Sequence, residues 1–474
     1  MTSTLALATI MSSAFVPTLA FPLAKPPPHL QGLDVAIVGG GVAGMATALA
    51  LQTLAGVSST VYEAESGIGK GDFGLSLWPN GMRALRCMDV DLHDEVVRAG
   101  SAVKETLFTT CEATHINYCD ERAEYGHPLL CLRSSSLHNA LRRSVLRHDC
   151  TISTGTLCKG VRPSPAPQGG SSSTTFSRGV GGGSSGVNVN GGRVELHLNL
   201  KGEEGEGEVV TAGLVIGADG LRSVVRKQLG DLDPPRDAEV VWFVGTVSHK
   251  ACPLLMRSRL HQFLMQDPGN VAFLMPVGNY TYWAVALAGP DQYEAMTVEN
   301  SGVAMRGYLE HKFGECKVLV EMVRATPSKR IRRHQIQDRP ALESFVQGSR
   351  PGEAPIVLVG DAAHPGRPSL GQGANLALED AVQLALLLRD ADSVKEALRE
   401  YDEARVDRCA MLQGDIDFVA RRARTRFTKG VGAAGGTGDE GLGHSQQNRG
   451  LGDRDFTYNW EPVRLSRPRP FSNR

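Results

Sequence analysis

Three glycines with the spacing Gly-x-Gly-x-x-Gly are the residues of this sequence whose arrangement most clearly indicates a bound ligand. Gly39, Gly41 and Gly44 follow directly after an apolar, β-type run, Leu33–Val38. An apolar run of helical length, Met45–Leu54, comes after them. In a strand–turn–helix unit the first glycine permits the tight turn, the second lets a pyrophosphate approach the backbone, and the third lets the helix pack closely on the strand. The free N–H groups at the start of the helix then face the phosphates.

A second strand and an acidic residue complete this unit. Val57–Glu63 has the composition of a strand, and Glu63 lies about 20 residues beyond the glycines, where such units carry an acid that accepts hydrogen bonds from ribose hydroxyls. The neighbouring Val42, Ala43 and Ala64 are assigned to the same site. A glycine-rich turn without a ligand is the alternative interpretation. This motif alone does not distinguish FAD from NAD.

Three later segments, Cys131–Arg133, Gly217–Arg226 and Gly360–Ala381, carry polar residues and glycines in a characteristic order. Together with the glycine turn they resemble the single-component, class A FAD-dependent aromatic hydroxylases, the family that includes para-hydroxybenzoate hydroxylase and salicylate hydroxylase. The similarity extends over about residues 33–420. A fourth segment, Gly74–Gly81, resembles the corresponding stretch of FAD-dependent urate hydroxylases, and zeaxanthin epoxidases are a more distant match.

The resemblance implies roles for individual residues in binding FAD. Ser76 would lie near the flavin, Arg133 would bind the diphosphate or ribityl region, and Asp361 would hold the ribityl chain. Asp219 would have a structural role and a contact with NAD(P)H, or would be an ordinary turn acid. The backbone N–H groups of one glycine-rich loop would bind the pyrimidine end of the flavin as an anion-binding nest. That loop consists of Gly371, Gln372, Gly373, Ala374 and Asn375.

The same resemblance gives candidates for residues near the reacting atoms, but it assigns no catalytic side chain. Pro368 falls where the family places a proline against the isoalloxazine. Arg367 would steer an anionic substrate or point into solvent, and His364 would act as a base or be structural. Four aromatic residues are assigned either to a substrate pocket or to packing of a sheet: Trp242, Tyr280, Tyr282 and Trp283.

FAD is therefore the cofactor that the resemblance implies, with NADPH or NADH as a transient co-substrate that has no dinucleotide-binding domain of its own. O₂ and a small organic molecule would be the other reactants. The implied activity is hydroxylation of a small aromatic or heterocyclic substrate through a flavin C4a-hydroperoxide. Two alternatives stay open: another flavin reaction on the same scaffold, such as epoxidation, and a non-catalytic flavin-binding protein.

Composition excludes several other classes of protein. Lysine and arginine total 50 and aspartate and glutamate total 51, so the chain lacks the positive charge typical of nucleic-acid-binding domains. The nine cysteines form no C-x-x-C pair and no cysteine–histidine group with zinc spacing, so we predict no metal site. Prolines and hydroxyl side chains interrupt the apolar N-terminal stretch, which argues against a stable membrane span there. The sequence does not set the oligomeric state.

These observations predict an α/β fold, in which a Rossmann-like FAD-binding domain carries an inserted, mostly antiparallel sheet domain for the substrate. Short β-rich runs between residues 240 and 287 are the basis for the second domain, and 209–216 is expected to be one strand. The predicted boundaries are 1–30 for a targeting or disordered segment, 31–230 for the first part of the FAD-binding domain with a flexible Gly/Ser insertion at 163–192, 231–345 for the sheet domain, 346–428 for the second part with C-terminal helices, and 429–474 for a disordered tail.

The N-terminal stretch carries no charged side chain before Lys25. Its run Ser13–Pro17 resembles the cleavage junction of plastid presequences in algae with secondary plastids. The resemblance implies import into a plastid. The alternative is a disordered N-terminal extension that has no targeting function, on a cytoplasmic protein.

Overall fold

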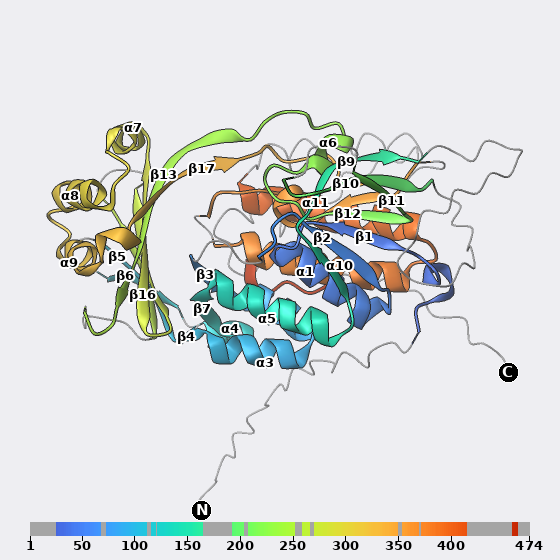
Figure 1. Ribbon diagram of the computed structural model, residues 1–474. Helices are drawn as coiled ribbons and strands as arrows, with labels where there is room; N and C mark the ends of the chain where they lie inside the picture. Colours follow the sequence, from blue (N-terminus) through green and yellow to red (C-terminus); the bar gives the residue numbers. More distant parts are fainter. Residues whose placement is uncertain are drawn as a thin grey trace, which may run out of the picture.

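The computed structural model describes residues 25–67, 73–110, 115–119, 121–164, 192–202, 207–251, 258–265, 270–348, 353–368, 371–414 and 457–462. Most of the predicted N-terminal segment, Gly/Ser insertion and C-terminal tail lie outside these residues. The chain forms a larger α/β lobe with a Rossmann-like sheet and a smaller lobe built on a second sheet (Figure 1). The predicted fold class is therefore confirmed. Among the helices in the described ranges, none is both long and apolar enough to cross a membrane.

A six-stranded sheet forms the centre of the larger lobe. Its order is β18 (Val346–Gln347), β19 (Ile356–Leu358), β12 (Leu214–Gly217), β1 (Val35–Val38), β2 (Ser59–Glu63) and β8 (Thr151–Thr154). All neighbours are parallel except β18 and β19. Every residue of β1, β12 and β19 is apolar or glycine and is buried, as expected for strands of a parallel sheet that is covered on both faces.

Helices surround this sheet. They are α1 (Val42–Ala50), which continues as the π-helical turn η2 (Leu51–Ala55), α2 (Pro79–Met88), α3 (Val90–Ala99), α4 (Glu121–Tyr125), α5 (Ser134–Arg147), α6 (Val224–Gln228), α10 (Gly373–Asp390) and α11 (Val394–Gln413). Short 3-10 turns are η1 (Pro28–Leu30) and η4 (Gly360–Ala362). α10 packs against α1, α2 and α11, and its residues from Asn375 to Leu388 are all buried. It is therefore an interior helix, and its polar side chains need partners inside the protein.

Two small antiparallel sheets flank the central one. They consist of β3 (Gly74–Leu77), β7 (Leu129–Arg133) and β4 (Ser101–Val103), and of β11 (Glu208–Ala212), β10 (Val194–Leu200) and β9 (Thr156–Pro163). The prediction of one strand over 209–216 is wrong, because β11 and β12 belong to different sheets. The chain changes sheets at Gly213, whose N–H bonds to the carbonyl oxygen of Asp34 and where a Cβ would crowd the Asp34 carboxylate.

The second lobe is a seven-stranded sheet with helices on its outer face. The strand order is β17 (Arg332–Asp338), β13 (Arg236–Ser248), β16 (Tyr280–Ala288), β15 (Val271–Val277), β14 (Arg259–Leu264), β5 (Glu105–Thr110) and β6 (His115–Cys119). The outer elements are α7 (Pro290–Thr297), α8 (Gly302–Lys312), α9 (Lys317–Ala325) and the short turn η3 (Ser328–Arg330). Pairing is antiparallel except between β14 and β5. Two of the strands thus come from residues 105–119, well before the predicted domain boundary.

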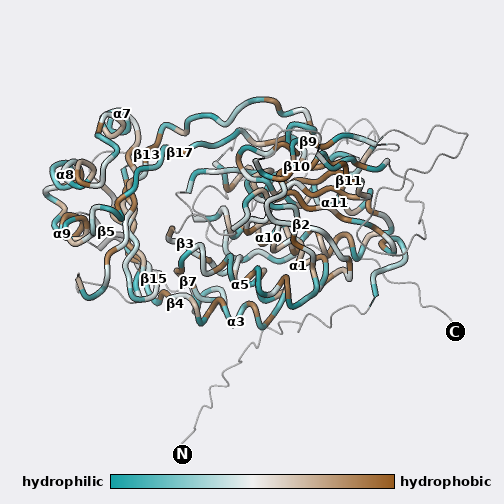
Figure 2. Tube along the Cα trace, viewed as in Figure 1, coloured by the Kyte–Doolittle hydropathy of each residue, from teal (hydrophilic) through white to brown (hydrophobic). Residues whose placement is uncertain are grey.

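The long strands β13 and β17 run side by side between the two lobes (Figure 1). Figure 2 shows that apolar residues gather inside the larger lobe, whereas β17 and the beginning of β13 are largely polar. These two strands form the β13–β17 ribbon, and its polar end lies where the two lobes join.

Part of the C-terminal tail is ordered, so the prediction of a disordered tail at 429–474 does not hold for residues 457–462. Residues 457–462 lie against α2 and α11 of the larger lobe. Trp460 is buried, and its carbonyl oxygen accepts a hydrogen bond of 2.5 Å from Nη1 of Arg83. The carbonyl oxygen of Thr457 accepts one of 3.1 Å from Nη2 of Arg408. The predicted pattern missed this segment because its glycine-rich surroundings dominate the local composition.

Candidate active site

The Gly39–Gly44 turn has the geometry that a phosphate-binding turn requires. Gly39 has a φ of +102°, and a Cβ there would overlap the carbonyl oxygen of Ala218, which directly follows the neighbouring strand β12. A Cβ on Gly44 would overlap the carbonyl oxygen of Gly39. A Cβ on Gly41 would meet no atom within 4 Å. Gly39 and Gly44 thus allow close backbone packing, and Gly41 leaves open space at the N-terminus of α1. Val42 and Ala43 form the first turn of this helix, where the N–H groups have no partner within the helix.

Glu63 at the end of β2 holds this turn in place. Its Oε2 accepts a hydrogen bond of 2.7 Å from the N–H of Gly40, and its Oε1 accepts one of 2.7 Å from the N–H of Glu65. His138 of α5 also contacts the turn, because its Nε2 lies 2.6 Å from the carbonyl oxygen of Gly40. The carboxylate has further lone pairs for a ribose, which is the predicted partner. Ala64 follows directly and is half-buried.

A second cradle forms where the Gly371 loop meets the end of β3. The side chain of Asn375 joins the two segments: its Oδ1 accepts from the N–H of Trp78 at 2.9 Å, and its Nδ2 donates to the carbonyl oxygens of Ser76 and Gly371 at 3.0 and 2.8 Å. A Cβ on Gly81 would overlap this amide, so the approach requires glycine in α2. Sequence reasoning gave Asn375 only a backbone role, and its side chain proves to be the clamp.

Two buried donors in this cradle have no hydrogen-bond partner among the described residues. They are Nε1 of Trp78 and Nε2 of Gln372, both on buried side chains. The indole Nε1 lies 3.1 Å from the position that a Cβ on Gly371 would take. Because buried polar groups are rarely left unpaired, this arrangement fits a ligand that brings hydrogen-bond acceptors. A flavin pyrimidine ring has such acceptors, and the free N–H groups at the start of α10 lie beside it.

Asp361 lies in η4, next to the same helix start. Its side chain is exposed. Desolvation by the surrounding protein raises the pKa of this carboxyl, the nearby His364 lowers it and Asp380 raises it, and the net shift is upward. One carboxylate oxygen is 3.8 Å from where a Cβ on Gly373 would lie. A carboxylate in this position can accept hydrogen bonds from hydroxyl groups, as the predicted ribityl contact requires.

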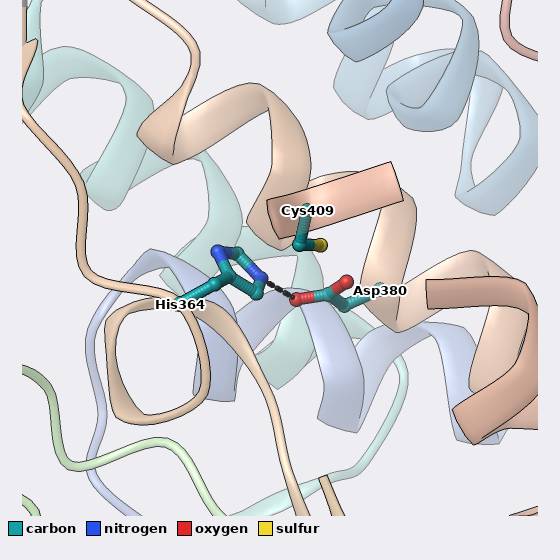
Figure 3. Close-up of side chains that lie close together, drawn as sticks. All are labelled: His364, Asp380 and Cys409. Atoms are coloured by element: carbon teal, nitrogen blue, oxygen red, sulfur yellow. Dashed lines mark hydrogen bonds and ion pairs between the residues drawn. The ribbon is translucent and has the colours of Figure 1, made fainter. Parts of the chain in front are cut away.

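A buried group of charges fixes the loop that carries Asp361. Asp380 of α10 accepts hydrogen bonds from the N–H of Gly360 at 2.8 Å, from Nε2 of His364 at 2.6 Å and from Nε of Arg405 at 2.7 Å. Burial alone would raise the pKa of Asp380, but His364 and Arg405 lower it to about 2. Burial would lower the pKa of His364, but Cys409 and Asp380 raise it well above its ordinary value. His364 is fully buried in this ion pair (Figure 3), which favours its structural interpretation.

Glu379 extends the network toward the second cradle. It accepts from Arg405 at 2.6 Å, from Arg408 at 2.7 Å and from Nδ2 of Asn80 at 2.7 Å. Asn80 also donates to Oε1 of Gln372 at 3.0 Å. Sequence reasoning missed Arg405 and Arg408, which stand on α11 without any local motif. The sequence did offer one indication of these partners, because Glu379 and Asp380 are adjacent acids in the largely apolar helix α10 and would need cations beside them once buried.

His364, Asp380 and Cys409 lie close enough to hold a metal ion, since one potential ligand atom of each falls within 4.8 Å of the others (Figure 3). All three are buried, and the carboxylate is already bonded to the guanidinium of Arg405. A second cation at this carboxylate would be repelled by the first. We therefore interpret the cluster as an ion-pair network that positions the Gly360 turn.

Three other predicted residues lie at the edges of the site. Asp219 caps α6, because its carboxylate accepts from Oγ of Ser223 at 2.5 Å and from the N–H of Val224 at 2.7 Å. The guanidinium of Arg133 lies 5.0 Å from the ring centroid of Tyr280, on the second sheet. Pro368 is exposed. The direct contacts of these residues with cofactors stay predictions.

Aromatic and apolar side chains fill the region between β3, β7 and the second sheet. Trp78, Phe273, Met275 and Tyr282 belong to one buried cluster, and Oγ of Ser76 lies 4.0 Å from the Met275 sulfur. Trp242 packs on this cluster. Trp283 belongs to a different core, where its Nε1 donates to Oγ1 of Thr326 at 2.8 Å.

The ordered C-terminal segment adds an aromatic side chain to this region. The ring of Tyr458 stacks on Trp78 with centroids 4.6 Å apart and an interplanar angle of 4°. Its edge faces Tyr125, at a centroid distance of 5.6 Å. The composition of the C-terminal tail gave no indication that Tyr458 lies near the site.

Comparison with known proteins agrees with this geometry. A family model described as an FAD binding domain matches residues 185–412. Aurachin C monooxygenase/isomerase of Stigmatella aurantiaca is 28% identical over 82% of this chain and 88% of its own length. The 3-amino-4-hydroxybenzoate 2-monooxygenase of Streptomyces cremeus is 29% identical over 84% of this chain and 88% of its own length. The chain is thus similar to monooxygenases over more than four fifths of its length, and an FAD binding domain matches nearly half of it.

Solved structures share the fold of this chain. Klebsiella pneumoniae HpxO, complexed with FAD and uric acid, superimposes with a TM-score of 0.62 at 19% identity, over 85% of this chain and 94% of HpxO. A tetrameric form of 2-methyl-3-hydroxypyridine-5-carboxylic acid oxygenase gives a TM-score of 0.60 at 21% identity, over 82% and 92% of the two chains.

Proposed function

We propose that this monooxygenase uses NAD(P)H and O₂ to hydroxylate a small aromatic or heterocyclic substrate. The overall reaction joins one oxygen atom to the substrate and releases the other as water, while NAD(P)H is oxidised. FAD, when bound, accepts the hydride and activates O₂, by the C4a-hydroperoxide route that the family resemblance implies. Two relatives support this class of substrate: one is a 3-amino-4-hydroxybenzoate 2-monooxygenase and the other is an FAD-dependent urate hydroxylase.

The observation that carries the proposal is the pair of cradles at the two ends of one site. The open turn at Gly41 suits a pyrophosphate, and the unpaired donors of Trp78 and Gln372 suit the pyrimidine end of a flavin. Asp361 belongs between them as the ribityl partner. In this proposal the protein orients the ring, excludes water and offers N–H groups where negative charge develops on the flavin.

The apolar cluster that contains Trp78, Phe273 and Tyr282 is the proposed substrate region. Burial raises the pKa of the Tyr282 hydroxyl well above its ordinary value, so this phenol stays neutral at any pH at which the enzyme would work. It can act as a hydrogen-bond donor to a substrate but not as a base.

An absorbance spectrum of the purified full-length chain, taken after incubation with FAD and gel filtration, tests the cofactor assignment. The full chain is needed because residues 457–462 belong to the fold. Anaerobic NADPH or NADH should bleach the bound flavin, and O₂ with aromatic acids or purine-like heterocycles should then give a product heavier by one oxygen. A folded protein that retains no FAD would contradict the proposal. Bound FAD that is never reduced would favour a non-catalytic flavoprotein.

Epoxidation is the second candidate. Zeaxanthin epoxidase of Nicotiana plumbaginifolia, named as chloroplastic, is 25% identical over 83% of this chain, which spans 55% of that protein. NMR spectroscopy of the product distinguishes an epoxide from a phenol. The same relative supports the proposal that residues 1–30 direct import into a plastid. Fusion of these residues to a fluorescent protein tests it, and a diffuse cytoplasmic signal would contradict it.

A further inference from the structure

A small cavity lies where the β13–β17 ribbon joins the larger lobe. Its enclosed volume is about 30 Å³. Its walls come from the start of β13, the end of β17, the loop that follows His364, and the last turn of α11. The lining residues are Arg236, Asp338, Arg339, Ala341, Pro365, Gly366, Arg367 and Gln413.

Positive charge exceeds negative charge around this cavity. Asp338 is paired with two arginines, since its Oδ1 lies 2.5 Å from Nε of Arg236 and its Oδ2 lies 3.5 Å from Nε of Arg367. Arg339 faces Asp231 at 3.3 Å, but that carboxylate also binds Arg226 at 2.5 Å.

Four guanidinium groups thus share two carboxylates, which leaves two positive charges without a protein counterion in this group. Arg339 is 3% exposed, and its Nε has no hydrogen-bond partner among the described residues. A buried guanidinium with an unpaired N–H, lining a cavity with a net positive charge, fits an anionic ligand.

The position of the cavity argues against an aromatic substrate as the source of the anion. Its lining shares no residue with the apolar cluster around Trp78 and Tyr282. A cavity of about 30 Å³ excludes a whole dinucleotide and leaves room only for a small group such as a phosphate. It adjoins the loop Pro365–Arg367, which leads directly to Pro368, the residue expected against the isoalloxazine. A nicotinamide nucleotide that delivers hydride near Pro368 would therefore place its adenosine end within reach of the three arginines that line the cavity.

We propose that this cavity binds the 2′-phosphate of NADPH and makes the enzyme prefer NADPH to NADH. A phosphate monoester carries about two negative charges at neutral pH, which matches the excess of two positive charges. Arginine forks bind phosphate oxygens in a bidentate manner. Arg367, with more than half of its side chain exposed and only a 3.5 Å ion pair to hold it, can turn toward the phosphate. The inference rests on the proposed use of a nicotinamide nucleotide by this enzyme.

Calorimetric titration of the FAD-loaded, full-length protein with 2′,5′-ADP and with 5′-ADP tests the site without any turnover. We expect 2′,5′-ADP to bind at least about tenfold more tightly, the ratio that one charge-assisted hydrogen bond supplies. Arg367→Gln should remove most of this difference. Arg324→Gln is the matched control, because Arg324 is an exposed arginine on α9 that pairs with one carboxylate, Glu310, at 3.0 Å. The control should bind both nucleotides as the unaltered protein does.

Steady-state kinetics give the second readout. Arg367→Gln should raise the KM for NADPH about tenfold and leave the KM for NADH unchanged, because only binding of the 2′-phosphate is lost. Equal affinity for the two ADP compounds, or unchanged discrimination in Arg367→Gln, would overturn the inference. Binding of inorganic phosphate without discrimination between the nucleotides would also overturn it, and would indicate a site for free anions. Failure of both NADPH and NADH to reduce the flavin would instead contradict the proposed function, and the ADP titration would still report on the cavity.

Discussion

Replacing Arg405 by leucine would remove the central cation of the buried network. Arg405 is completely buried and contacts Asp380 at 2.7 Å and Glu379 at 2.6 Å. Removal of one partner from a buried ion pair destabilises a protein by about 3–5 kcal/mol. Glu379 would keep Arg408, and Asp380 would keep His364. We therefore expect a loss of about 3 kcal/mol in the free energy of unfolding, at the lower end of that range.

The loss should depend on pH. The pKa of Asp380 is lowered from 3.8 to about 2 in the folded protein, so its ionisation stabilises the fold above pH 3.8, and this contribution disappears as the pH falls toward 2. Without Arg405 the folded-state pKa rises toward the unfolded value, and that contribution shrinks. The difference between the unaltered protein and Arg405→Leu should thus be largest near neutral pH and decrease below about pH 4.

Urea denaturation at a fixed FAD concentration, followed by circular dichroism at several pH values, measures this difference. Arg399→Leu is the control, because Arg399 lies on the same helix with 54% of its side chain exposed. It should change stability by no more than about 0.5 kcal/mol. A loss below about 1 kcal/mol for Arg405→Leu at neutral pH, or a loss independent of pH, would refute the assignment of Arg405 as the required counterion of the two acids.

Three further predictions concern the cofactor and the C-terminal segment. Gly41→Ala should leave the stability of the FAD-free protein unchanged, because its Cβ meets no atom within 4 Å, and should still weaken FAD binding about tenfold. Gly44→Ala should instead destabilise the fold itself, because its Cβ would overlap the carbonyl oxygen of Gly39. Equal melting temperatures of the two FAD-free variants would contradict this prediction. Asp361→Ala should weaken FAD retention about tenfold or more, measured by fluorescence titration, and unchanged affinity would exclude the ribityl contact. Tyr458→Ala should lose the stack on Trp78, worth about 1 kcal/mol, and expose the C-terminal segment to limited proteolysis; an unchanged cleavage pattern would show that the stack does not hold the segment.

Much of the FAD-binding lobe could be predicted from local sequence. The β1–α1–β2 unit follows from the alternation of apolar runs with glycines. The steric need for glycine at Gly44 comes from Gly39 of the same motif, whereas at Gly39 it comes from the distant Ala218. The order of the later segments, matched to a family resemblance, then predicted Asp361 and the Gly371 loop as parts of the same site.

Side-chain pairing across long stretches of chain could not be predicted in this way. Asn375 clamps Ser76 from 299 residues away, and Arg405 neutralises acids 25 and 26 positions earlier on a different helix. The sequence shows that two acids interrupt an apolar helix, but the identity of their counterions depends on how α10 packs on α11. The same holds for β5 and β6, which join the second sheet although they lie far from its other strands in the chain.

The sequence by itself determined the local turns, because phosphate-binding geometry is encoded within a few consecutive residues. FAD as the cofactor followed from the family resemblance of the later segments and not from the turn. The tertiary structure decided which buried charges are paired, that Tyr458 stacks on Trp78, and that three arginines surround one cavity. These features arise from segments that meet only after folding. Burial and charge, which give them their chemical meaning, are properties of the packed protein and not of any one segment.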